Sequence, residues 1–480
     1  MGPGAPLHKE TSSRSVPPGW DDALVTDDII DDLTWRGLIA LSTDQDDLRR
    51  ALAAGPVTLY GGFDPTAAGL HIGNLVLLLT MRRLQLAGHR PIGLVGGATG
   101  LIGDPSGKSA ERVLNPRDTV AGWVERIRGE VGRFLDFEPG PAGALLVSNL
   151  DWTEQLSALD FLRDVGKHFP VNQMLAREAV KARLEAGGIS YTEFSYQLLQ
   201  AYDYLELHRR YDCTLQVGGS DQWGNLVAGV DLIRRVTSAS VHALATPLIT
   251  KPDGTKYGKT EGGTIWLSPD LMSPYAFYQF WINRTDAEVG GLLRVFTFRS
   301  RAEIEDIERE TRERPSARAG QRLLAEDVTS LVHGRDEYVK AAAASEALFG
   351  RGDLGGLDEP TLAAALAEIP SVQLSADGTT IVPGTPGAPA GPGDGADGPG
   401  AAAGTGRGRL PLVTDLMAAA GIVASKSAAR RAVAEGGAYL NNRKVTDPEA
   451  RPARADLLHG RFLVLRRGKR TVGGVEVLPA

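Results

Sequence analysis

Apolar and β-branched residues come in short runs near the start of the chain, and longer stretches of helical spacing separate them. Residues 57–61 predict a strand, residues 75–87 a helix and residues 91–95 a second strand. Consecutive strands joined through a helix favour a parallel sheet, because parallel neighbours need a long crossover connection. The pattern therefore predicts an α/β domain built on a parallel sheet.

The pattern changes twice further along the chain. From residue 274 to about residue 349, apolar residues recur at helical spacing with charged residues between them, which predicts a mostly α-helical segment. In residues 383–408, Gly, Ala and Pro fill 21 of the 26 positions. Such a segment has too little bulky apolar surface to form a core, so a flexible, partly extended linker is expected there.

The segment after this linker predicts a small unit made of one helix and one hairpin. Ser425 is a suitable N-cap for a short basic helix over residues 426–435. Asn441 and Asn442 then favour a tight turn between two short strands. Basic side chains on such a unit suit contact with RNA, although exposed arginines on a small domain are the alternative. The candidate RNA-contacting residues are Arg430, Arg431, Arg443 and Lys444.

Composition narrows the class of protein. Apolar residues make up 42% of the chain and charged residues 23%, as in soluble globular proteins. A single cysteine, Cys213, excludes an intrachain disulfide framework and suits a reducing compartment. The first 20 residues do not resemble a signal peptide, and apolar runs such as residues 75–81 are too short to span a bilayer. A cytoplasmic protein with no membrane contact is therefore predicted.

The net charge of −7 is unevenly distributed along the chain. Residues 409–480 contain 13 Lys and Arg against 6 Asp and Glu, a charge of +7, which leaves residues 1–408 at −14. A basic tail on an acidic body indicates a polyanionic partner for the tail. Charge alone leaves open the alternative of a solvated basic surface.

A first cluster of candidate chemistry runs from residue 60 to residue 74. A strand enters a glycine-rich turn at Gly61 and Gly62, and a helix begins near Gly73. Backbone can approach a phosphate closely at glycine, and a helix start offers N–H donors to it. The imidazole of His71 could donate to phosphate oxygens as charge develops there. A histidine at a helix start can equally be structural.

A second cluster lies in residues 255–260. Lys256, Lys259 and Thr260 share a loop with Gly258. Two lysines and a hydroxyl on a glycine-containing loop suit a clamp for a triphosphate. Taken alone, the same residues also fit an ordinary exposed turn.

Taken together, the two clusters resemble a known enzyme family. Residues 60–74 resemble the His-Ile-Gly-His signature of the class I aminoacyl-tRNA synthetases, and residues 256–260 resemble their Lys-Met-Ser-Lys-Ser loop. Within that class, three further segments look like the bacterial-type tyrosyl-tRNA synthetases. They are residues 96–107, 194–203 and 216–225.

The resemblance covers about residues 26–350 in order and spacing and resumes in the tail. It implies a Rossmann-like parallel-sheet catalytic domain, an α-helical anticodon-side domain and a small α+β RNA-binding (S-four-like) domain. It also implies a homodimer formed through a dimerisation insertion around residues 164–191. The expected order is a flexible N-terminal tail (1–25), the catalytic domain with its insertion (26–272), the helical domain (273–352), a linker (353–408) and the RNA-binding domain (409–480).

The resemblance also implies the reaction. The carboxylate of L-tyrosine attacks the α-phosphate of ATP to give tyrosyl-adenylate and pyrophosphate, and the 3′ end of tRNA(Tyr) then takes the tyrosyl group. ATP is a substrate that carries Mg²⁺ on its triphosphate, and neither a tightly bound cofactor nor a dedicated metal-ligand cluster is expected. Catalysis would rest on positioning and on charge stabilisation. The implied catalytic residues are His71, Asn74, Lys256, Lys259 and Thr260.

The implied substrate pocket agrees with one spacing in the sequence. Tyr196, Gln200 and Asp203 stand at i, i+4 and i+7, which places them on one face of a helix. By resemblance, Tyr60 and Asp203 bond the phenolic hydroxyl of tyrosine, and the other tyrosine-binding residues hold its ammonium group. The implied tyrosine-binding residues are Tyr60, Asp104, Tyr196, Gln200, Asp203 and Gln222, and those for ATP are Gly62, Asp64, His71, Asn74, Gly219, Asp221 and Lys259.

One position departs from the family signature, because Asn74 stands where a second histidine is usual. Asparagine keeps a hydrogen-bond donor of similar reach, so ATP binding is expected to survive.

Two other functions stay open at this point. One is a different adenylate-forming enzyme, such as a tryptophanyl-tRNA synthetase or a small-molecule ligase. Tyr60 with Asp203 argues against tryptophan, and the basic tail argues against a small-molecule ligase. The other is an RNA-binding protein descended from a synthetase and inactive in aminoacylation. Both ATP clusters argue against it, and Asn74 argues weakly for it.

Overall fold

The computed structural model describes residues 28–65, 67–103, 115–250, 263–382 and 409–479. The chain divides into two compact units. The first unit comprises Met1–Met272 and Asn283–Leu331, and the second comprises Ser273–Ile282 and Val332–Ala480. Among the described residues, no helix is long and apolar enough to cross a membrane.

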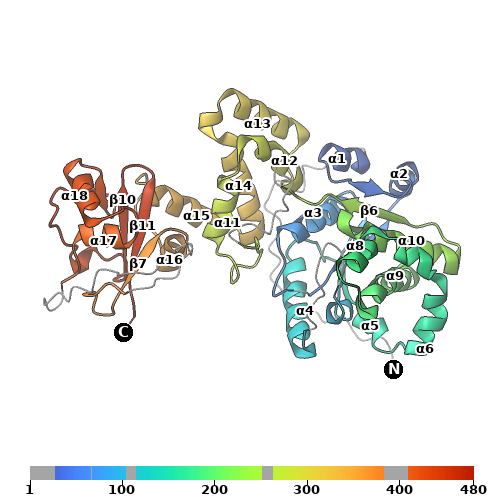
Figure 1. The fold of residues 1–480 in the computed structure, drawn as a ribbon. Coiled ribbons are helices and arrows are strands. Elements are labelled where there is room, and N and C mark those ends of the chain that lie inside the picture. Colours follow the sequence, from blue (N-terminus) through green and yellow to red (C-terminus); the bar gives the residue numbers. More distant parts are fainter. Residues whose placement is uncertain (1–27, 66, 104–114, 251–262, 383–408, 480) are drawn as a thin grey trace. The chain divides into compact units, whose positions relative to one another are not determined.

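A six-stranded sheet in the order β1-β6-β5-β2-β3-β4 forms the centre of the first unit (Figure 1). The strands from β6 to β4 pair in parallel, and the short β1 lies antiparallel at the β6 edge. The predicted parallel sheet is thus confirmed, and the two strands expected from the apolar runs are β2 and β3. The strands are β1 (Leu41–Ser42), β2 (Thr58–Phe63), β3 (Arg90–Val95), β4 (Leu145–Ser148), β5 (Cys213–Gly219) and β6 (His242–Thr246).

Helix α3 (Ile72–Leu86) connects β2 to β3 and packs on four strands of the sheet. Because its surroundings are apolar on nearly every side, an unbroken run of its residues is buried. Helices α9 (Tyr191–Tyr211) and α10 (Trp223–Thr237) pack on each other and on β5. The other helices of this part are α1 (Ile29–Trp35), α2 (Gln45–Ala54), α4 (Arg117–Val131), α5 (Leu150–Thr153), α6 (Ala158–Asp160), α7 (Val171–Leu175) and α8 (Glu178–Ala186), with 3-10 turns η1 (Thr99–Leu101) and η4 (Ser220–Gln222).

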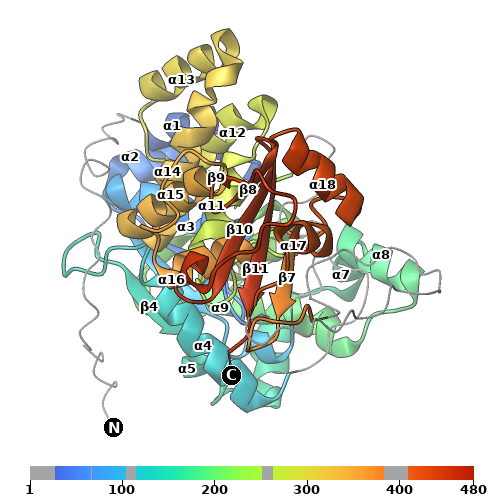
Figure 2. The same ribbon diagram turned by 90° about the vertical axis from the view of Figure 1, so that its left-hand side faces the viewer.

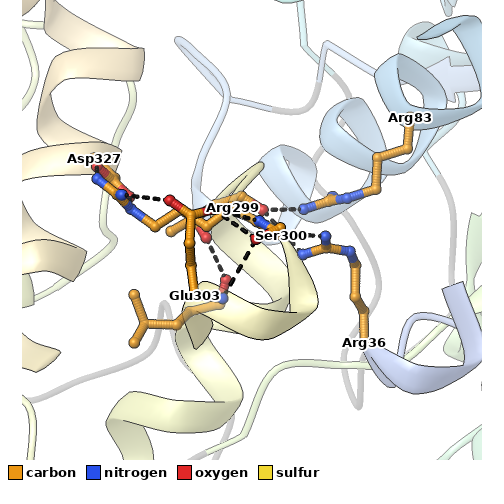
Figure 3. A network of polar contacts seen from close by, with 8 residues as sticks. Arg36, Arg83, Arg299, Ser300, Glu303 and Asp327 are labelled. Carbon is orange, nitrogen blue, oxygen red and sulfur yellow. Dashed lines mark hydrogen bonds and ion pairs between the residues drawn. The ribbon is translucent and has the colours of Figure 1, made fainter. Parts of the chain in front are cut away.

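Two buried arginines attach the helices after residue 283 to the sheet domain (Figure 3). Arg36 and Arg83 donate to backbone oxygens at and just after the end of α12 (Asp286–Phe296), where a helix leaves carbonyls without partners. Arg299 in turn holds Asp327 of α14, with Nε 2.6 Å from Oδ2. The acceptors of the two buried arginines are the carbonyls of Arg294, Val295, Thr297 and Arg299, and the helices that follow are α13 (Arg301–Glu313) and α14 (Ala319–His333).

The second unit combines helices with a five-stranded sheet in the order β7-β11-β10-β8-β9, seen in Figure 2. Strand β10 pairs antiparallel with β11 and β8, and β7 pairs in parallel with β11. Apolar residues of the sheet and of α17 and α18 form one core. The elements are α11 (Pro274–Ile282), α15 (Arg335–Leu348), α16 (Glu359–Ala367), β7 (Ser371–Leu374), α17 (Val413–Ala419), α18 (Lys426–Ala434), β8 (Ala438–Leu440), β9 (Arg443–Lys444), β10 (Phe462–Arg467) and β11 (Thr471–Val477).

The structure differs from the expected linker and helical domain. The expected linker over residues 353–408 contains α16 and β7 before its glycine-rich part, and the core around Val372 and Leu374 is shared with the tail. The sequence pattern missed β7 because a four-residue strand carries little periodic signal and its partner β11 lies far along the chain. The helices expected in one domain over residues 273–352 are divided between the two units.

The tail after the linker follows its predicted local structure. Ser425 caps α18, and its side chain accepts from the Ala428 backbone N–H at 3.2 Å. Strands β8 and β9 form the hairpin, and Asn441 and Asn442 have φ of 44° and 63° in its turn. Asparagine tolerates this left-handed region better than most residues, and a turn with two positive φ values matches the twist of a hairpin.

Two truncations are expected to behave differently because of β7. Ending the chain after Val382 keeps β7 but removes β11, so Val372 and Leu374 lose their cover. Ending it after Glu368 removes β7 and keeps α16. The longer protein should therefore bind more of a hydrophobic dye and aggregate more readily, because an unpaired strand edge promotes association. Dye fluorescence and light scattering of both proteins check this, and equal behaviour would show that β7 does not depend on the tail.

Candidate active site

Polar side chains gather at the carboxyl ends of the parallel strands in the first unit. Asp64 follows β2, Thr99 lies after β3, Asn149 follows β4 and Asp221 lies after β5. From β2 the chain builds outward to β3 and β4, and it later returns to add β5 and β6 on the other side. Ligands of open α/β sheets bind outside the carboxyl ends at such a switch point. This edge is the candidate active site.

A chain of hydrogen bonds crosses this edge. Tyr196 of α9 donates its hydroxyl to Asp64 Oδ2 at 2.6 Å, and Thr99 Oγ1 donates to Asp64 Oδ1 at 2.6 Å. Asn149 Nδ2 lies 3.0 Å from Thr99 Oγ1 and 3.0 Å from Asp203 Oδ2. These hydrogen bonds therefore join Asp64 to Asp203 through Thr99 and Asn149. The sequence predicted the two acidic residues as site residues but not the two that connect them.

Asp203 is a carboxyl group buried inside the unit, with only 3% of the residue exposed. Trp152 Nε1 donates to its Oδ1 at 2.8 Å, and Asn149 donates to the other oxygen. Burial raises the pKa of Asp203 to about 7, while the two donors oppose this rise because they favour the charged form. Each carboxyl oxygen of Asp203 therefore accepts one hydrogen bond, from a neighbouring group that can only donate.

The hydroxyl of Tyr60 is buried and has no hydrogen-bond partner among the described residues. Tyr60 lies on β2, and its ring centroid is 5.2 Å from that of Tyr204. Burial, and then the charge of Asp203, raise the pKa of Tyr60, so the group remains a phenol. An unpaired buried hydroxyl costs about 1–3 kcal/mol. A polar group of a ligand would remove that cost.

Gln200 lies one turn after Tyr196 on α9, as its spacing predicts. Its Oε1 accepts from Asn225 Nδ2 of α10 at 3.1 Å. This bond links the two helices next to the site and fixes which end of the Gln200 amide faces α10.

The predicted residues at the ends of β2 and β5, and in the turn after β5, lie where a ligand could approach backbone. Gly62 is exposed, and nothing lies within 4 Å of a Cβ built on it. Gly219 ends β5, and a Cβ there would lie 2.7 Å from Asp221 Oδ1. The Asp221 carboxylate therefore sits directly over a glycine. Gln222 completes this turn, η4, before α10 begins.

The start of α3 orients His71 and Asn74 together. His71 is the N-cap residue, and its Nδ1 accepts from the Gly73 N–H at 3.0 Å. Its own backbone N–H donates to Asn74 Oδ1 at 3.0 Å. Since Nδ1 is an acceptor, the proton of a neutral His71 ring is on Nε2. Gly73 is required here, because a Cβ would lie 2.8 Å from His71 Cε1.

Four predicted site residues lie outside the described residues. They are Asp104, Lys256, Lys259 and Thr260.

Thr99, Asn149 and Trp152 are site residues that the sequence reasoning missed. The available signal was their position, since each follows the end of a parallel strand, and Asn149 comes directly after the apolar run of β4. The hydrogen bond between Thr99 and Asp64 also requires glycine at position 96, because a Cβ on Gly96 would overlap Asp64 Oδ1 and Thr99 Oγ1. Only glycine lets these two side chains meet.

The four predicted RNA-contacting residues lie in the second unit and are all exposed. Arg430 and Arg431 are on α18, and Arg443 and Lys444 form β9. Arg430 pairs with Glu449 at 2.8 Å, but both side chains are at least half exposed, so this pair holds the arginine only weakly.

Comparison with known protein families agrees with this arrangement. The model of the family described as tRNA synthetases class I (W and Y) matches residues 52–350. The model described as Tyrosine--tRNA ligase SYY-like C-terminal domain matches residues 405–472. The fold is that of a class I tRNA synthetase.

Individual relatives narrow this class. The tyrosine–tRNA ligase of Streptomyces coelicolor is 59% identical over 455 residues, which are 94% of this chain and 100% of that protein. The tyrosine–tRNA ligase of Thermobifida fusca is 58% identical, over 93% of this chain and 99% of its own. A C-terminally truncated mitochondrial tyrosyl-tRNA synthetase from Aspergillus nidulans has a TM-score of 0.62 at 28% identity, covering 68% of this chain and 98% of its own. The chain belongs to the tyrosine–tRNA ligases of the class I tRNA synthetase family.

The raised pKa of Asp203 gives folding a pH dependence that one substitution isolates. Its carboxyl keeps a proton up to about pH 7 when folded, against a usual pKa of 3.8. Between these values the folded state binds more protons than the unfolded state, so Asp203 disfavours folding increasingly as the pH rises. Asp203→Asn cannot ionise. The Tm of Asp203→Asn should therefore rise relative to that of the wild type from about pH 4 to about pH 7 and then stay level, by roughly 2–4 °C for each kcal/mol.

Thermal unfolding of both proteins across this pH range checks the prediction. The readout is the difference between the two Tm values, because other groups change both proteins alike. Asp221→Asn, in the exposed turn η4, is the control for loss of one carboxylate from the site. A difference for Asp203→Asn that does not change with pH would contradict a buried, protonatable Asp203.

Proposed function

We propose that this enzyme activates L-tyrosine with ATP to tyrosyl-adenylate and pyrophosphate, and then transfers tyrosine to the 3′ end of tRNA(Tyr). The observation that carries this proposal is the pair formed by Tyr60 and Asp203. One is a buried hydroxyl without a partner among the described residues, and the other is a buried carboxyl whose hydrogen-bonded neighbours only donate. A phenolic hydroxyl can accept from Tyr60 and donate to Asp203 at the same time. Phenylalanine has no hydroxyl and can make neither of these two hydrogen bonds.

The ammonium group of tyrosine is assigned to Tyr196, Gln200 and Gln222, together with Asp104. Tyr196 donates its proton to Asp64, so it presents oxygen lone pairs as acceptors. Gln200 Oε1 holds one donor and has a second lone pair. Acceptors on α9 therefore suit a cation at one end of the pocket, while Asp203 on the same helix suits a hydroxyl at the other.

The triphosphate of ATP is assigned to the start of α3. The Nε2–H of His71 and the amide of Asn74 supply donors, and the N-terminus of the helix favours negative charge. Lys256, Lys259 and Thr260 are assigned to the same phosphates through the family signature. No covalent protein intermediate is needed, because positioned donors and cations stabilise the charge that develops on the α-phosphate. Gly62, Asp64, Gly219 and Asp221 are assigned to the rest of the nucleotide.

Mg²⁺ is assigned to the triphosphate rather than to a protein cage. This ion keeps several waters and usually binds substrate phosphates with one or two carboxylates. Among the described residues, no group of three or more His, Cys, Asp or Glu could hold a metal ion.

The basic C-terminal module is assigned to the tRNA. Residues 409–480 carry a net charge of +7, and the four exposed basic residues on α18 and β9 offer contacts to phosphates. The cytoplasm is the proposed location, which agrees with the single cysteine, Cys213, being buried and unpaired.

Tyrosine-dependent exchange of pyrophosphate into ATP tests the first half of the reaction. Exchange is expected with tyrosine and not with tryptophan. Full exchange without any charging of tRNA would show that the enzyme forms the adenylate but does not transfer tyrosine to tRNA, and it would reject the second step of the proposal. No exchange with tyrosine would reject the proposal.

A homodimer is proposed to form through the segment around residues 164–191, which runs from just after α6 to the first residue of α9 and has α6 beside it in the sequence. Large hydrophobic side chains in this short stretch are unusually exposed, with Leu159 at 80%, Val171 at 58% and Tyr191 at 69%. Several exposed apolar side chains within one segment support an interaction surface there. The other exposed hydrophobic residues in the stretch are Leu162, Leu175 and Leu184.

A charge placed on this surface should produce monomers. Val171→Asp buries a carboxylate if the dimer forms there, so sedimentation velocity should show a smaller species than for the wild type. Val339→Asp is the matched control, because Val339 is 51% exposed on α15 in the other unit. An unchanged size for Val171→Asp would contradict an interface at this residue.

Tyr60→Phe and Tyr204→Phe should have opposite effects. Removing the unpartnered Tyr60 hydroxyl should not reduce stability, but it should narrow the preference for tyrosine over phenylalanine in kcat/KM. Removing the Tyr204 hydroxyl, which donates to the His242 carbonyl at 2.8 Å, should reduce stability by about 1 kcal/mol and keep the preference. Exchange kinetics and thermal unfolding separate these effects. A preference unchanged by Tyr60→Phe would show that Tyr60 does not read the hydroxyl.

A further inference from the structure

Two segments far apart in sequence pair directly beside His71. The Ile72 N–H donates to the Ile265 carbonyl at 3.0 Å, and the Leu267 N–H donates to the Leu70 carbonyl at 2.9 Å. His71 lies opposite Trp266 in this antiparallel contact, and their ring centroids are 6.5 Å apart. The backbone on both sides of His71 is thus held by residues 265–267.

One helix holds both members of this pair. Glu130 of α4 accepts from the Leu70 N–H, with Oε2 2.6 Å from the nitrogen. Arg126, one turn earlier on the same helix, donates to Ser268 Oγ at 2.8 Å and to Asp270 Oδ2 at 3.0 Å. Arg126 Nε also lies 3.6 Å from Glu130 Oε1. Arg126 and Glu130 therefore join the segment before His71 to the segment after Trp266.

The contact with Glu130 is built into the core. Glu130 is 3% exposed, and burial raises its pKa, while the Leu70 N–H and Arg126 oppose that rise. Gly69 allows the approach, because a Cβ there would lie 3.0 Å from Glu130 Oε1 and 3.0 Å from Leu271 Cδ1. Burial of this carboxylate costs free energy, which its hydrogen bond from the Leu70 N–H and its ion pair with Arg126 offset.

We propose that Arg126 and Glu130 are positioning residues for His71 in adenylate formation, an inference that rests on the proposed function. They touch no substrate. They fix the backbone on both sides of His71 and so set where its Nε2–H meets the phosphates. Since a misplacement of about 1 Å can lower a rate about 100-fold, a small shift of this backbone should reduce turnover with ATP. The tyrosine pocket, which lies on β2 and α9, does not depend on this contact.

The test compares Arg126→Met with Arg128→Met in the full-length enzyme. Arg128 is the matched control, because it lies on the same helix and makes an exposed pair with Glu125 at 3.3 Å. Arg126→Met should lower kcat/KM for ATP in pyrophosphate exchange by about tenfold or more, and Arg128→Met should stay within about twofold of the wild type. The tyrosine Kd without ATP, measured by equilibrium dialysis, should stay within about twofold for both variants.

Two conservative variants separate positioning from folding. Arg126→Lys keeps the charge but cannot reach Glu130, Ser268 and Asp270 together, so it should recover only part of the lost rate. Glu130→Gln keeps an acceptor for Leu70, and its effect combined with Arg126→Met should be less than the product of the two, because both act on one contact.

The proposal is overturned if Arg126→Met keeps wild-type kcat/KM for ATP. It is also overturned if the tyrosine Kd rises as much as kcat/KM falls, since that would indicate damage to the whole unit. Failure of the proposed function is distinct, because the wild-type enzyme itself would then show no tyrosine-dependent exchange.

Discussion

A carboxylate can be buried only where hydrogen-bond donors replace the water that it loses, and the site depends on this constraint at Asp203. Its donors, Asn149 and Trp152, come from the segment after β4, while Asp203 is on α9. Asn149 also bonds Thr99, which follows β3 and holds Asp64 after β2. The bonds that offset the burial of the Asp203 carboxyl therefore belong to the network that holds three strand ends together. The pocket that we propose for the tyrosine hydroxyl is thus ordered before any substrate binds.

The same constraint recurs where helices join the sheet domain. Arg36 and Arg83 are buried, and both find acceptors among carbonyls at the end of α12 (Figure 3). Two nitrogens of Arg83, Nε and Nη1, still have no partner among the described residues, and its guanidinium lies 4.7 Å from the ring centroid of Phe298. Such a group tolerates few other arrangements of its neighbours, because leaving a buried charge unpaired costs several kcal/mol. The contacts of Arg83, which lies on α3, therefore attach the end of α12 firmly to α3.

Local patterns predicted the elements whose signals are local. The strands β2 and β3, the helix α3, the Ser425 cap and the hairpin at Asn441 and Asn442 each follow from a few neighbouring residues. Residues that depend on distant partners could not be found in this way. Nothing near Thr99, Asn149 or Glu130 indicates the carboxylate or backbone group that each contacts, since those partners lie 35 to 60 positions away. The strand β7 was missed for the same reason.

The departure at position 74 has a physical explanation in the cap of α3. The residue at this position must accept from the His71 N–H, and Asn74 does so with Oδ1. In the proposed site it also presents a donor toward the phosphates, because the same amide carries NH₂ on its other side. Histidine meets both demands with its two ring nitrogens, one as acceptor and one as donor. Asparagine meets them with one planar group and no titration near neutral pH, so the helix start keeps its donors while losing one source of pH dependence.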